Sequence, residues 1–589
     1  MDYIIIESKN IKWNYSSYTD AKGRTYIISY YNQWDSVKKQ SRIAKRVHVG
    51  RLDSDTGEVT CGKAYLDAHP DLIGKNLFYE DNKLVERTEE EVEQIKAEVN
   101  KDLSFRCDSV SFGLTYGCWE LAKTSGMQKA LTQVFGDELG NELLRLGIYE
   151  LCSHGEAMQN YEDWLAMNYL PNAEPLSSQK ISYLLSQVQQ EQIDEYFVLR
   201  HNRIIANHND LKEKAKEQGI ELPPMMMAID STSISTYSET IDNAAFGHAK
   251  QDDFLKQINL TLCVDYATGD TCYAYESEGS INDMSLFPDL LLRMQNCGIK
   301  LDEVLITTDR GYSSVLNVQK QINCDLKFLT GVKLSEDTTK KYIDKYRSSL
   351  SNPAFLNGEL GVYARTTPVV EKWSSTCNGI TTDANVYLHL YRDGELGERQ
   401  NRAFMADVQR LLKLKVANKT CDPLLWRKYG KCLTLDEKTK NWSINASIVE
   451  KACKYNGYFA IRTNTVEDPF DSMVIYRERN IVETCFRQFK VLDDGERLRA
   501  TASSYKGKLF IHLLAQNLRM MMTVAASKHK ADGKVLPGDS ITKAMLQLQN
   551  LQASKPAGRG VWIVKEIPKK TRDLFDLFKI AYPKKQVKN

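Results

Sequence analysis

The order of apolar and polar residues divides the chain into a β-rich start, a long helical stretch and a mixed remainder. Residues 1–85 alternate apolar and polar positions around glycine turns, as in "RTYIISYYNQW" and "VHVGRLDSDTGEV", which predicts short strands. "TEEEVEQIKAEV" and then residues 117 to about 223 have helical spacing. Within them "LSSQKISYLLSQVQQEQIDEYF" predicts an amphipathic helix with Ser177 or Ser178 as its N-cap. This helical region fits either DNA binding or ordinary helical packing.

The pattern changes at "ELPPMMMAIDSTSISTYSE", where two prolines precede an apolar run. That run, Met225 to Ile229, predicts a buried strand that ends in Asp230. "QINLTLCVDYATGDTCYAYESEGS" predicts a hairpin turned at residues 267–270, and "DMSLFPDLLLRMQNCGI" a helix. "DEVLITTDRGYSS" predicts another buried strand that ends in Asp309. Strands, hairpin, helix and strand in this order indicate an α/β domain.

The segment "YRERNIVETCFRQFK" predicts a helix with two different faces. At 100° per residue, Tyr476, Arg479, Glu483 and Lys490 fall within about 60° of one another, with Arg487 beside them. The apolar residues form a contiguous sector that would pack on a core. The polar stripe fits ordinary i,i+4 ion pairs at a helix edge, worth about 0.2–0.5 kcal/mol each. It equally fits a carboxylate for a hard cation, flanked by cations for phosphates and an aromatic ring for a base, provided that partner carboxylates exist elsewhere.

Composition bounds the possible functions. The 589 residues, 42% hydrophobic and 26% charged, suffice for three or four domains with real cores. No run approaches twenty apolar residues, and the first residues do not form a signal peptide, so we expect a cytoplasmic, nucleoid-associated protein with no membrane partner. Thirteen scattered cysteines without a CxxC pair argue against a structural zinc site.

Charge is balanced overall and segregated locally. Lys and Arg number 78 and Asp and Glu 77, so the net charge of +1 does not indicate a polyanion partner. Residues 37–51 nevertheless hold six basic and no acidic residues, and residues 551–589 hold ten basic against three acidic. We interpret each run first as a solvated face or tail, with nucleic-acid contact as the alternative.

Two aspartates occupy equivalent positions in the predicted α/β domain. If their strands lie side by side and parallel, Asp230 and Asp309 emerge at the same sheet edge, where open α/β sheets place their sites. Each Asp taken singly also fits a turn or a helix N-cap. Together with Glu483 they form an oxygen-only set, which suits Mg²⁺ or Mn²⁺ rather than zinc. Two such ions, about 3.5–4 Å apart, would activate the attacking oxygen and stabilise the leaving oxygen of a phosphodiester.

These motifs resemble those of the bacterial insertion-sequence DDE transposases of the YREK-signature group. "TTDRGY" and the complete Y-x2-R-x3-E-x6-K pattern are specific, whereas "IDST" is a weak match. The resemblance spans about residues 225–490 and continues in "SSYKGKLFIHLLAQNLRMMM". It implies an RNase H-like catalytic core, two Mg²⁺ ions per active site that Mn²⁺ can replace, and cut-and-paste movement of the encoding element.

Matched residue by residue, the resemblance assigns two sets of roles. Asp230, Asp309 and Glu483 match the catalytic, metal-binding triad. The DNA contacts would come from Tyr476, Arg479 and Lys490, with Arg487 beside them.

We therefore expect a multidomain α/β protein whose RNase H-like core is interrupted by an inserted, strand-containing domain and preceded by a small β-rich domain and a helical region. The spacing of 174 positions from Asp309 to Glu483 is what requires the insertion. The expected boundaries are 1–85 for the β-rich domain, 86–223 for the helical, DNA-end-binding region, 224–334 and 456–530 for the two parts of the core, 335–455 for the insertion, and 531–589 for a basic C-terminal segment.

The expected function is excision and integration of an insertion sequence by phosphodiester hydrolysis and strand transfer. One metal centre per end must break two antiparallel strands, and a direct route is a nick followed by attack of the freed 3′ hydroxyl on the opposite strand, which makes a hairpin. The expected partners are the element's own terminal inverted repeats, target DNA and a second copy of the chain. The apolar residues of "TRDLFDLFKIAYPKKQ" could pair two subunits or pack as a satellite core.

Two alternatives remain open. One is a related metal-dependent nuclease without strand transfer, and the other is a DNA-binding protein with a vestigial catalytic centre. Converging carboxylates argue against the second alternative, because a protein that only binds DNA gains nothing from like charges brought together.

Overall fold

The computed structural model describes most of the chain, in two compact units. The described residues are 12–20, 24–36, 38–53, 56–96, 107–247, 254–367, 371–377, 380–492, 495, 497–556 and 561–588. One unit comprises residues 1–109, 553–565 and 584–589, and the other comprises 110–552 and 566–583. The strand predicted at the start of the chain falls partly in residues 1–11, outside the described residues.

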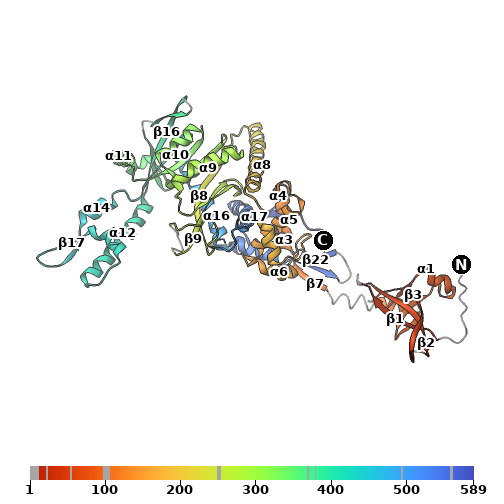
Figure 1. Cartoon of the computed structure of the whole chain (residues 1–589). Helices are drawn as coiled ribbons and strands as arrows, with labels where there is room; N and C mark the ends of the chain where they lie inside the picture. The colour runs from red at the N-terminus through yellow and green to blue at the C-terminus, as the bar shows by residue number, and fades with distance from the viewer. Residues whose placement is uncertain are drawn as a thin grey trace. The chain divides into compact units, whose positions relative to one another are not determined.

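The first unit is rich in strands, as its alternating pattern predicts (Figure 1). β1 to β4 form one antiparallel sheet in chain order, and β5 and β6 form a hairpin. A core of Ile27, Val49, Val59, Tyr65 and Leu77 lies between these strands and α1. The elements are β1 (Asn14–Thr19), β2 (Thr25–Asp35), β3 (Gln40–Leu52), β4 (Val59–Cys61), α1 (Lys63–Ala68), β5 (Asn76–Glu80) and β6 (Lys83–Arg87).

The C-terminal residues fold, although their charge suggested a solvated tail. β21, β22 and β23 form a four-stranded sheet with β7, in the order β23-β22-β21-β7. The bounds are β7 (Cys107–Ser111), α18 (Ile541–Gln549), β21 (Gln552–Pro556), β22 (Val561–Val564), α19 (Lys569–Leu577) and β23 (Gln586–Lys588). Leu574, Phe575, Phe578 and Ile580, in and just after α19, are buried within the chain, which favours the satellite-core interpretation over subunit pairing.

Helices follow the first strands in the chain, as the helical spacing predicts. Ser177 is the N-cap of α7, because its side chain accepts a hydrogen bond from the Lys180 amide. The single predicted helix is wrong, since the chain leaves the helix between α7 and α8 and Gln189 caps a new one. The elements are α3 (Gly113–Thr124), α4 (Met127–Phe135), α5 (Asp137–Ser153), α6 (Tyr161–Met167), α7 (Ser178–Ser186) and α8 (Gln190–Glu217).

A large mixed sheet organises the second unit, with strand order β10-β9-β8-β11-β12-β19-β16-β14-β13. β8 (Met225–Thr236), β9 (Lys256–Asp265) and β10 (Thr271–Glu278) are antiparallel, which confirms the predicted hairpin. β11 (Val304–Thr308) pairs parallel to β8, and β12 (Lys327–Val332) pairs parallel to β11. Three antiparallel strands followed by two parallel ones, in the order 3-2-1-4-5, form the expected RNase H-like core.

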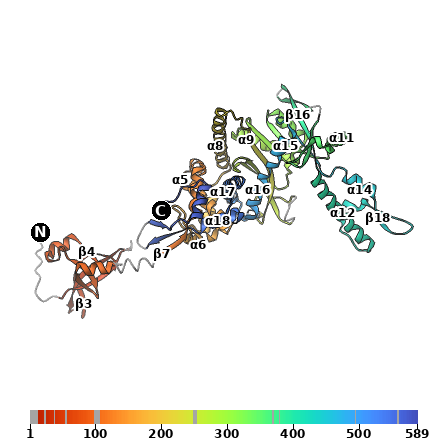
Figure 2. The same ribbon diagram turned by 180° about the vertical axis from the view of Figure 1, so that it is seen from behind.

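Helices cover both faces of this sheet (Figures 1 and 2). Adjacent residues of β12 show the two faces, because successive side chains of a strand point to opposite sides. Phe328 packs with residues of α10 (Val315–Asn323), whereas Leu329 packs with residues of α15 (Pro469–Glu478). α9 (Asp283–Cys297) lies next to α10, and α16 (Asn480–Arg487) follows α15 along the chain.

The predicted insertion follows β12 and continues the same sheet. β16 joins the sheet beside β19 (Tyr458–Thr463), and β14 and β13 extend it further. A helical part then packs on its own core of Val408, Leu411, Tyr429, Cys432 and Leu433. The elements are α11 (Asp337–Tyr346), β13 (Leu356–Asn357), β14 (Val362–Thr366), β15 (Glu371–Cys377), β16 (Ile380–Asp393), α12 (Gly394–Val416), α13 (Pro423–Tyr429), β17 (Leu433–Leu435), β18 (Trp442–Ile444) and α14 (Ala446–Cys453).

α17 (Tyr505–Ala531) is a central helix of the second unit. Among the described helices it is the one long and apolar enough to cross a membrane by length and composition, but 78% of its apolar window is buried inside the protein. Its polar residues Gln516 and Asn517 bond the start of β10 through Thr271. The helix is therefore accounted for as a core element.

Candidate active site

The pairing register of two parallel strands brings Asp230 beside Asp309. Ile229 of β8 pairs with Thr308 of β11, so the next residue on each strand is one of the two aspartates. The prediction that these strands are parallel neighbours is confirmed. The prediction that the first strand ends at Asp230 is wrong, because β8 continues to Thr236 along β9.

Asp309 combines a structural role with its half-buried position at the strand end. Its Oδ1 accepts a hydrogen bond from the Arg310 amide at 2.6 Å and caps the short 3₁₀ turn Arg310–Tyr312. The N-cap interpretation therefore holds, and it fixes the direction in which the carboxylate points. The other oxygen, Oδ2, has no hydrogen-bond donor among the described residues.

Two consecutive helices supply the third acid. α15 ends at Glu478 and α16 begins at Asn480, so the continuous helix predicted across this segment is wrong. The Val482 amide bonds the Arg479 carbonyl at 3.1 Å, an i→i+3 bond that tightens the chain at the junction. Tyr476 nevertheless contacts Asp309, and Glu483 is linked to Asp230 through Arg479.

A π-helical turn, Gln488–Leu492, follows α16 and changes the expected position of Lys490. Because a π turn holds more residues than an α turn, the 100° projection fails for Lys490. Lys490 is half-buried in that turn, and Arg487 is exposed at the end of α16. Tyr476 and Arg479 make hydrogen bonds that join the three acids.

Arg479 bridges two of the acids. Its Nη1 donates to Asp230 Oδ2 at 3.1 Å, and its Nη2 donates to Glu483 Oε1 at 2.9 Å. Arg479 is 8% exposed, whereas the Glu483 side chain is 55% exposed. Burial by itself lowers the pKa of Arg479, but Tyr476 and the carboxylates outweigh burial and raise its pKa above the usual value. The predicted i,i+4 ion pair between Arg479 and Glu483 is therefore present, and Arg479 also bonds a second acid, Asp230.

Tyr476 holds the remaining aspartate. Its hydroxyl donates to Asp309 Oδ1 at 3.1 Å, and its ring lies 5.6 Å from the Arg479 guanidinium carbon. Burial, together with the Asp309 charge, raises the pKa of Tyr476, so the hydroxyl stays protonated and remains a donor. Tyr476 and Arg479 therefore link all three acids into one network.

Two residues that the sequence analysis did not single out support this network. A Cβ at Gly331 of β12 would lie 2.4 Å from the Tyr476 hydroxyl oxygen, so only glycine leaves room for this contact. A lone glycine inside a predicted strand is the signal that could have found it. Tyr266 donates to the Ile475 carbonyl at 3.2 Å and lies 2.6 Å from Thr307 Oγ1, which ties α15 to β11. No sequence pattern pointed to Tyr266.

The chemical type of the three acidic side chains suits a hard divalent cation. All three side chains are carboxylates, and a guanidinium already stands as a shared cation between Asp230 and Glu483. Among the described residues, no three acidic, histidine or cysteine side chains lie close enough to hold an ion as they stand. A cation held by Asp230 and Glu483 would compete with the Arg479 guanidinium for the same carboxylates.

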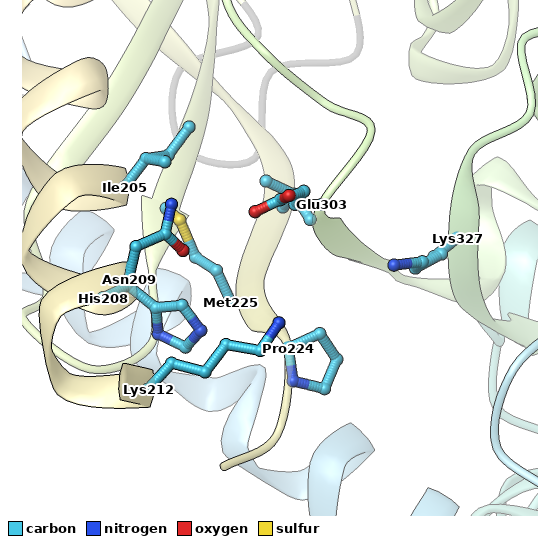
Figure 3. Close-up of a pocket in the computed structure, with 9 residues that line it drawn as sticks. Ile205, His208, Asn209, Lys212, Pro224, Met225, Glu303 and Lys327 are labelled. Atoms are coloured by element: carbon cyan, nitrogen blue, oxygen red, sulfur yellow. The ribbon is translucent and has the colours of Figure 1, made fainter. Parts of the chain in front are cut away.

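A separate small cavity lies at the opposite end of the parallel strands (Figure 3). It has a volume of about 90 Å³ and is lined by His208, Asn209 and Lys212 of α8, together with residues at the starts of β8, β11 and β12. Glu303 is its one carboxylate. With a single acid it does not compete with the Asp230–Asp309 edge as the candidate active site.

Comparison with known proteins bears on the same region. A family model described as "Transposase DDE domain" matches residues 222–518. Among solved structures, the chain is similar to a piggyBac transposase synaptic complex with hairpin DNA, solved by cryo-EM, at 10% identity and a TM-score of 0.33. That match covers 73% of this chain and 78% of the other. No curated protein matches the chain.

Proposed function

The chain belongs to the DDE transposase domain family, whose members cut and transfer DNA strands with divalent metal, and we propose that it excises and integrates its own element at Asp230, Asp309 and Glu483. The observation that carries this proposal is the parallel β8–β11 register, which sets the two aspartates side by side. Glu483 joins them through Arg479.

We infer that Asp230, Asp309 and Glu483 hold the divalent cations, with Mg²⁺ the ordinary ion and Mn²⁺ a substitute. Bound there, the ions would supply charge stabilisation for the attacking and leaving oxygens of the scissile phosphodiester. Tyr476 keeps Asp309 oriented through its hydrogen bond. Asp230 and Glu483 become available when Arg479 turns away from them.

Arg479 would then exchange one anion for another. A guanidinium binds a phosphate with the same forked geometry that it uses on carboxylates, so DNA phosphates can take over the donors that Asp230 and Glu483 use. DNA binding and metal binding would thus favour each other at this site. Arg487 ends α16 and Lys490 lies in the following π turn, and we propose that they hold the DNA backbone as in the YREK-signature group.

We further propose that the element ends pass through a hairpin. The 3′ hydroxyl freed by the first nick attacks a phosphodiester of the opposite strand, forms a new bond to that phosphorus and releases a 3′ hydroxyl on the flanking DNA. Unstacking a base at the hairpin tip costs a few kcal/mol, and an aromatic side chain can return about 1–3 kcal/mol per base. Tyr476 is the aromatic residue at the acids.

The proposed partners are the terminal inverted repeats of its own element, target DNA and a second copy of the chain. We assign end recognition to the residues before 224. Coordinated cutting of two ends calls for two copies, and mass photometry with and without end DNA measures this. A chain that stays monomeric on paired ends would exclude the dimer and leave the cleavage chemistry intact.

The test of the proposed function is a time course on a labelled inverted-repeat duplex with Mg²⁺, resolved on a denaturing gel. The proposal expects a nick, then a transient species longer than either released strand, then integration products. Nicks and double-strand breaks without the long species, even in Mn²⁺, would exclude the hairpin. Breaks without any joined product would instead support the nuclease alternative.

A further inference from the structure

The first unit carries a two-stranded extension whose chemistry no part of the catalytic proposal uses. β1 pairs with β2 only over residues 25–30, and β4 pairs with β3 only over residues 50–52. Beyond these limits, residues 31–35 and 40–46 pair with each other and with no further strand in the described part of the chain. We call residues 31–36 and 38–46 the β2–β3 ribbon. At about 3.4 Å per residue it extends roughly 20 Å from the sheet.

Unpaired positive charge dominates this ribbon. Lys38, Lys39, Lys45 and Arg46 are exposed, and none forms an ion pair with an acid in the described part of the chain. Asp35 is the ribbon's single acid, and its Oδ2 lies 3.9 Å from Arg42 Nε. The ribbon's field is therefore positive, although the net charge of the whole chain is only +1.

The two faces of the ribbon differ. Gln33 lies opposite Arg42, and Asp35 lies opposite Gln40, so one face carries two amides, the Arg42 guanidinium and the Asp35 carboxylate. Trp34 lies opposite Ser41 on the other face. Trp34 is 65% exposed, and Ile43 on the same face is 47% exposed.

We propose that the β2–β3 ribbon enters the major groove of duplex DNA with its Gln33–Arg42 face toward the base edges. This inference rests on the proposed function, because it names the element that reads the transposon end. The major groove admits a two-stranded ribbon, Arg recognises guanine through two hydrogen bonds, and Gln recognises adenine in the same way. Lys38 and Lys39, in the turn at the ribbon's end, lie where they can reach phosphates.

A competing explanation for the ribbon's lysines and arginines is that they protect an open strand edge. Lysines on an open strand edge prevent pairing with other chains, and any cation serves that purpose. Base reading requires more, because the planar fork of Arg42 cannot be replaced by a lysine ammonium. The conservative change Arg42→Lys therefore separates the two accounts.

The experiment selects duplexes from a random 20-base-pair library with the full-length chain and measures affinities by fluorescence anisotropy. We expect Arg42→Lys to weaken the selected duplex by about 5- to 150-fold and to relax the preference at one position. Lys38→Gln with Lys39→Gln should weaken selected and scrambled duplexes alike and reduce the slope of log affinity against log salt by about 1.8. Lys63→Gln with Lys83→Gln is the control, because it makes the same charge change on exposed lysines of the same unit. This control should change neither the affinity for DNA nor the salt slope.

The outcomes separate this inference from the proposed function. If Arg42→Lys shifts the selected motif in a chain that never cuts DNA, the ribbon inference stands and the catalytic proposal fails. If the chain cuts DNA and every ribbon variant selects the wild-type motif, the ribbon inference is overturned alone. It is also overturned if Trp34→Gln abolishes self-association while the charge variants leave DNA binding unchanged, since the ribbon would then be a contact between copies.

Discussion

The candidate active site and the β2–β3 ribbon use the same kind of side chain in opposite states. At the active site Arg479 is buried and bonded to two carboxylates. On the ribbon Lys38, Lys39, Lys45 and Arg46 are exposed, without an acid among the described residues. A cation that already satisfies acids cannot bind DNA until something replaces them, whereas an unpaired one binds phosphates at once. We therefore propose that the ribbon binds DNA first and that the candidate active site becomes competent only after Arg479 exchanges its acids for phosphates.

The largest expected effect separates catalysis from binding. Asp309→Asn keeps the size of the side chain and removes a proposed metal ligand, so cleavage should fall by more than about 1000-fold while DNA affinity stays within about threefold. The matched ribbon change, Lys38→Gln with Lys39→Gln, should weaken binding and leave the cleavage rate of saturated complexes unchanged. An Asp309→Asn protein that loses binding and cleavage together would indicate a structural role for this residue.

The second prediction concerns the metal response of the DNA-free chain. Arg479→Gln removes the cation between Asp230 and Glu483, and the uncompensated acid repulsion should cost about 1–3 kcal/mol of stability without metal. Mn²⁺ should then raise the melting temperature of this variant more than that of the wild type. Arg477→Gln is the control, because Arg477 is exposed and, within the described residues, its side chain bonds the Leu360 carbonyl rather than an acid. Equal Mn²⁺ shifts in all three proteins would contradict the account of Arg479.

A smaller effect should come from the glycine beneath the tyrosine. Gly331→Ala places a Cβ against the Tyr476 hydroxyl and should slow cleavage about tenfold by displacing it from Asp309. Tyr476→Phe should slow cleavage by a similar factor. The double variant should be no slower than either single one, because both changes break the same contact. Additive losses would place Gly331 and Tyr476 in separate roles.

The smallest effect concerns pH and belongs to the buried part of the second unit rather than to the ribbon. Burial, together with Lys508, holds the pKa of His512 well below its usual value. Below about pH 6.5 the unfolded chain therefore takes up a proton that the folded chain refuses, and stability should fall with pH by at most about 1.4 kcal/mol per unit. Melting temperatures from pH 7.5 to 5 should fall less steeply in His512→Gln. Parallel curves would exclude His512 as the source.

Some of this arrangement could be predicted from the sequence because it is local. The strand before Asp309, the hairpin at residues 267–270 and the cap at Ser177 each depend on neighbouring residues, and the structure contains all three. The adjacency of Asp230 and Asp309 followed from the rule that parallel strands end at one edge. Each of these inferences needed only a pattern and its period.

The rest depends on contacts that a pattern does not contain. A helix projection assumes one uniform period, so it missed the junction at Arg479 and the π turn that holds Lys490. The partners of Arg479 lie 249 and 4 residues away, and nothing local distinguishes it from a cation that awaits a phosphate. The ribbon's basic run resembled a solvated face for the same reason, because its lack of acidic partners becomes visible only in three dimensions.

The measurement that tests the central claim most directly maps the metal position on the protein itself. Fe²⁺ replaces Mg²⁺ in the DNA-bound chain, ascorbate and peroxide generate hydroxyl radicals at the bound ion, and mass spectrometry locates the peptide breaks. In the wild type, the account predicts breaks near residues 230, 309 and 483 when DNA is bound and far fewer breaks without DNA. In Arg479→Gln, it predicts the same breaks even without DNA. Breaks centred elsewhere, or a pattern that ignores both DNA and Arg479, would contradict the assignment of these three carboxylates as the active site.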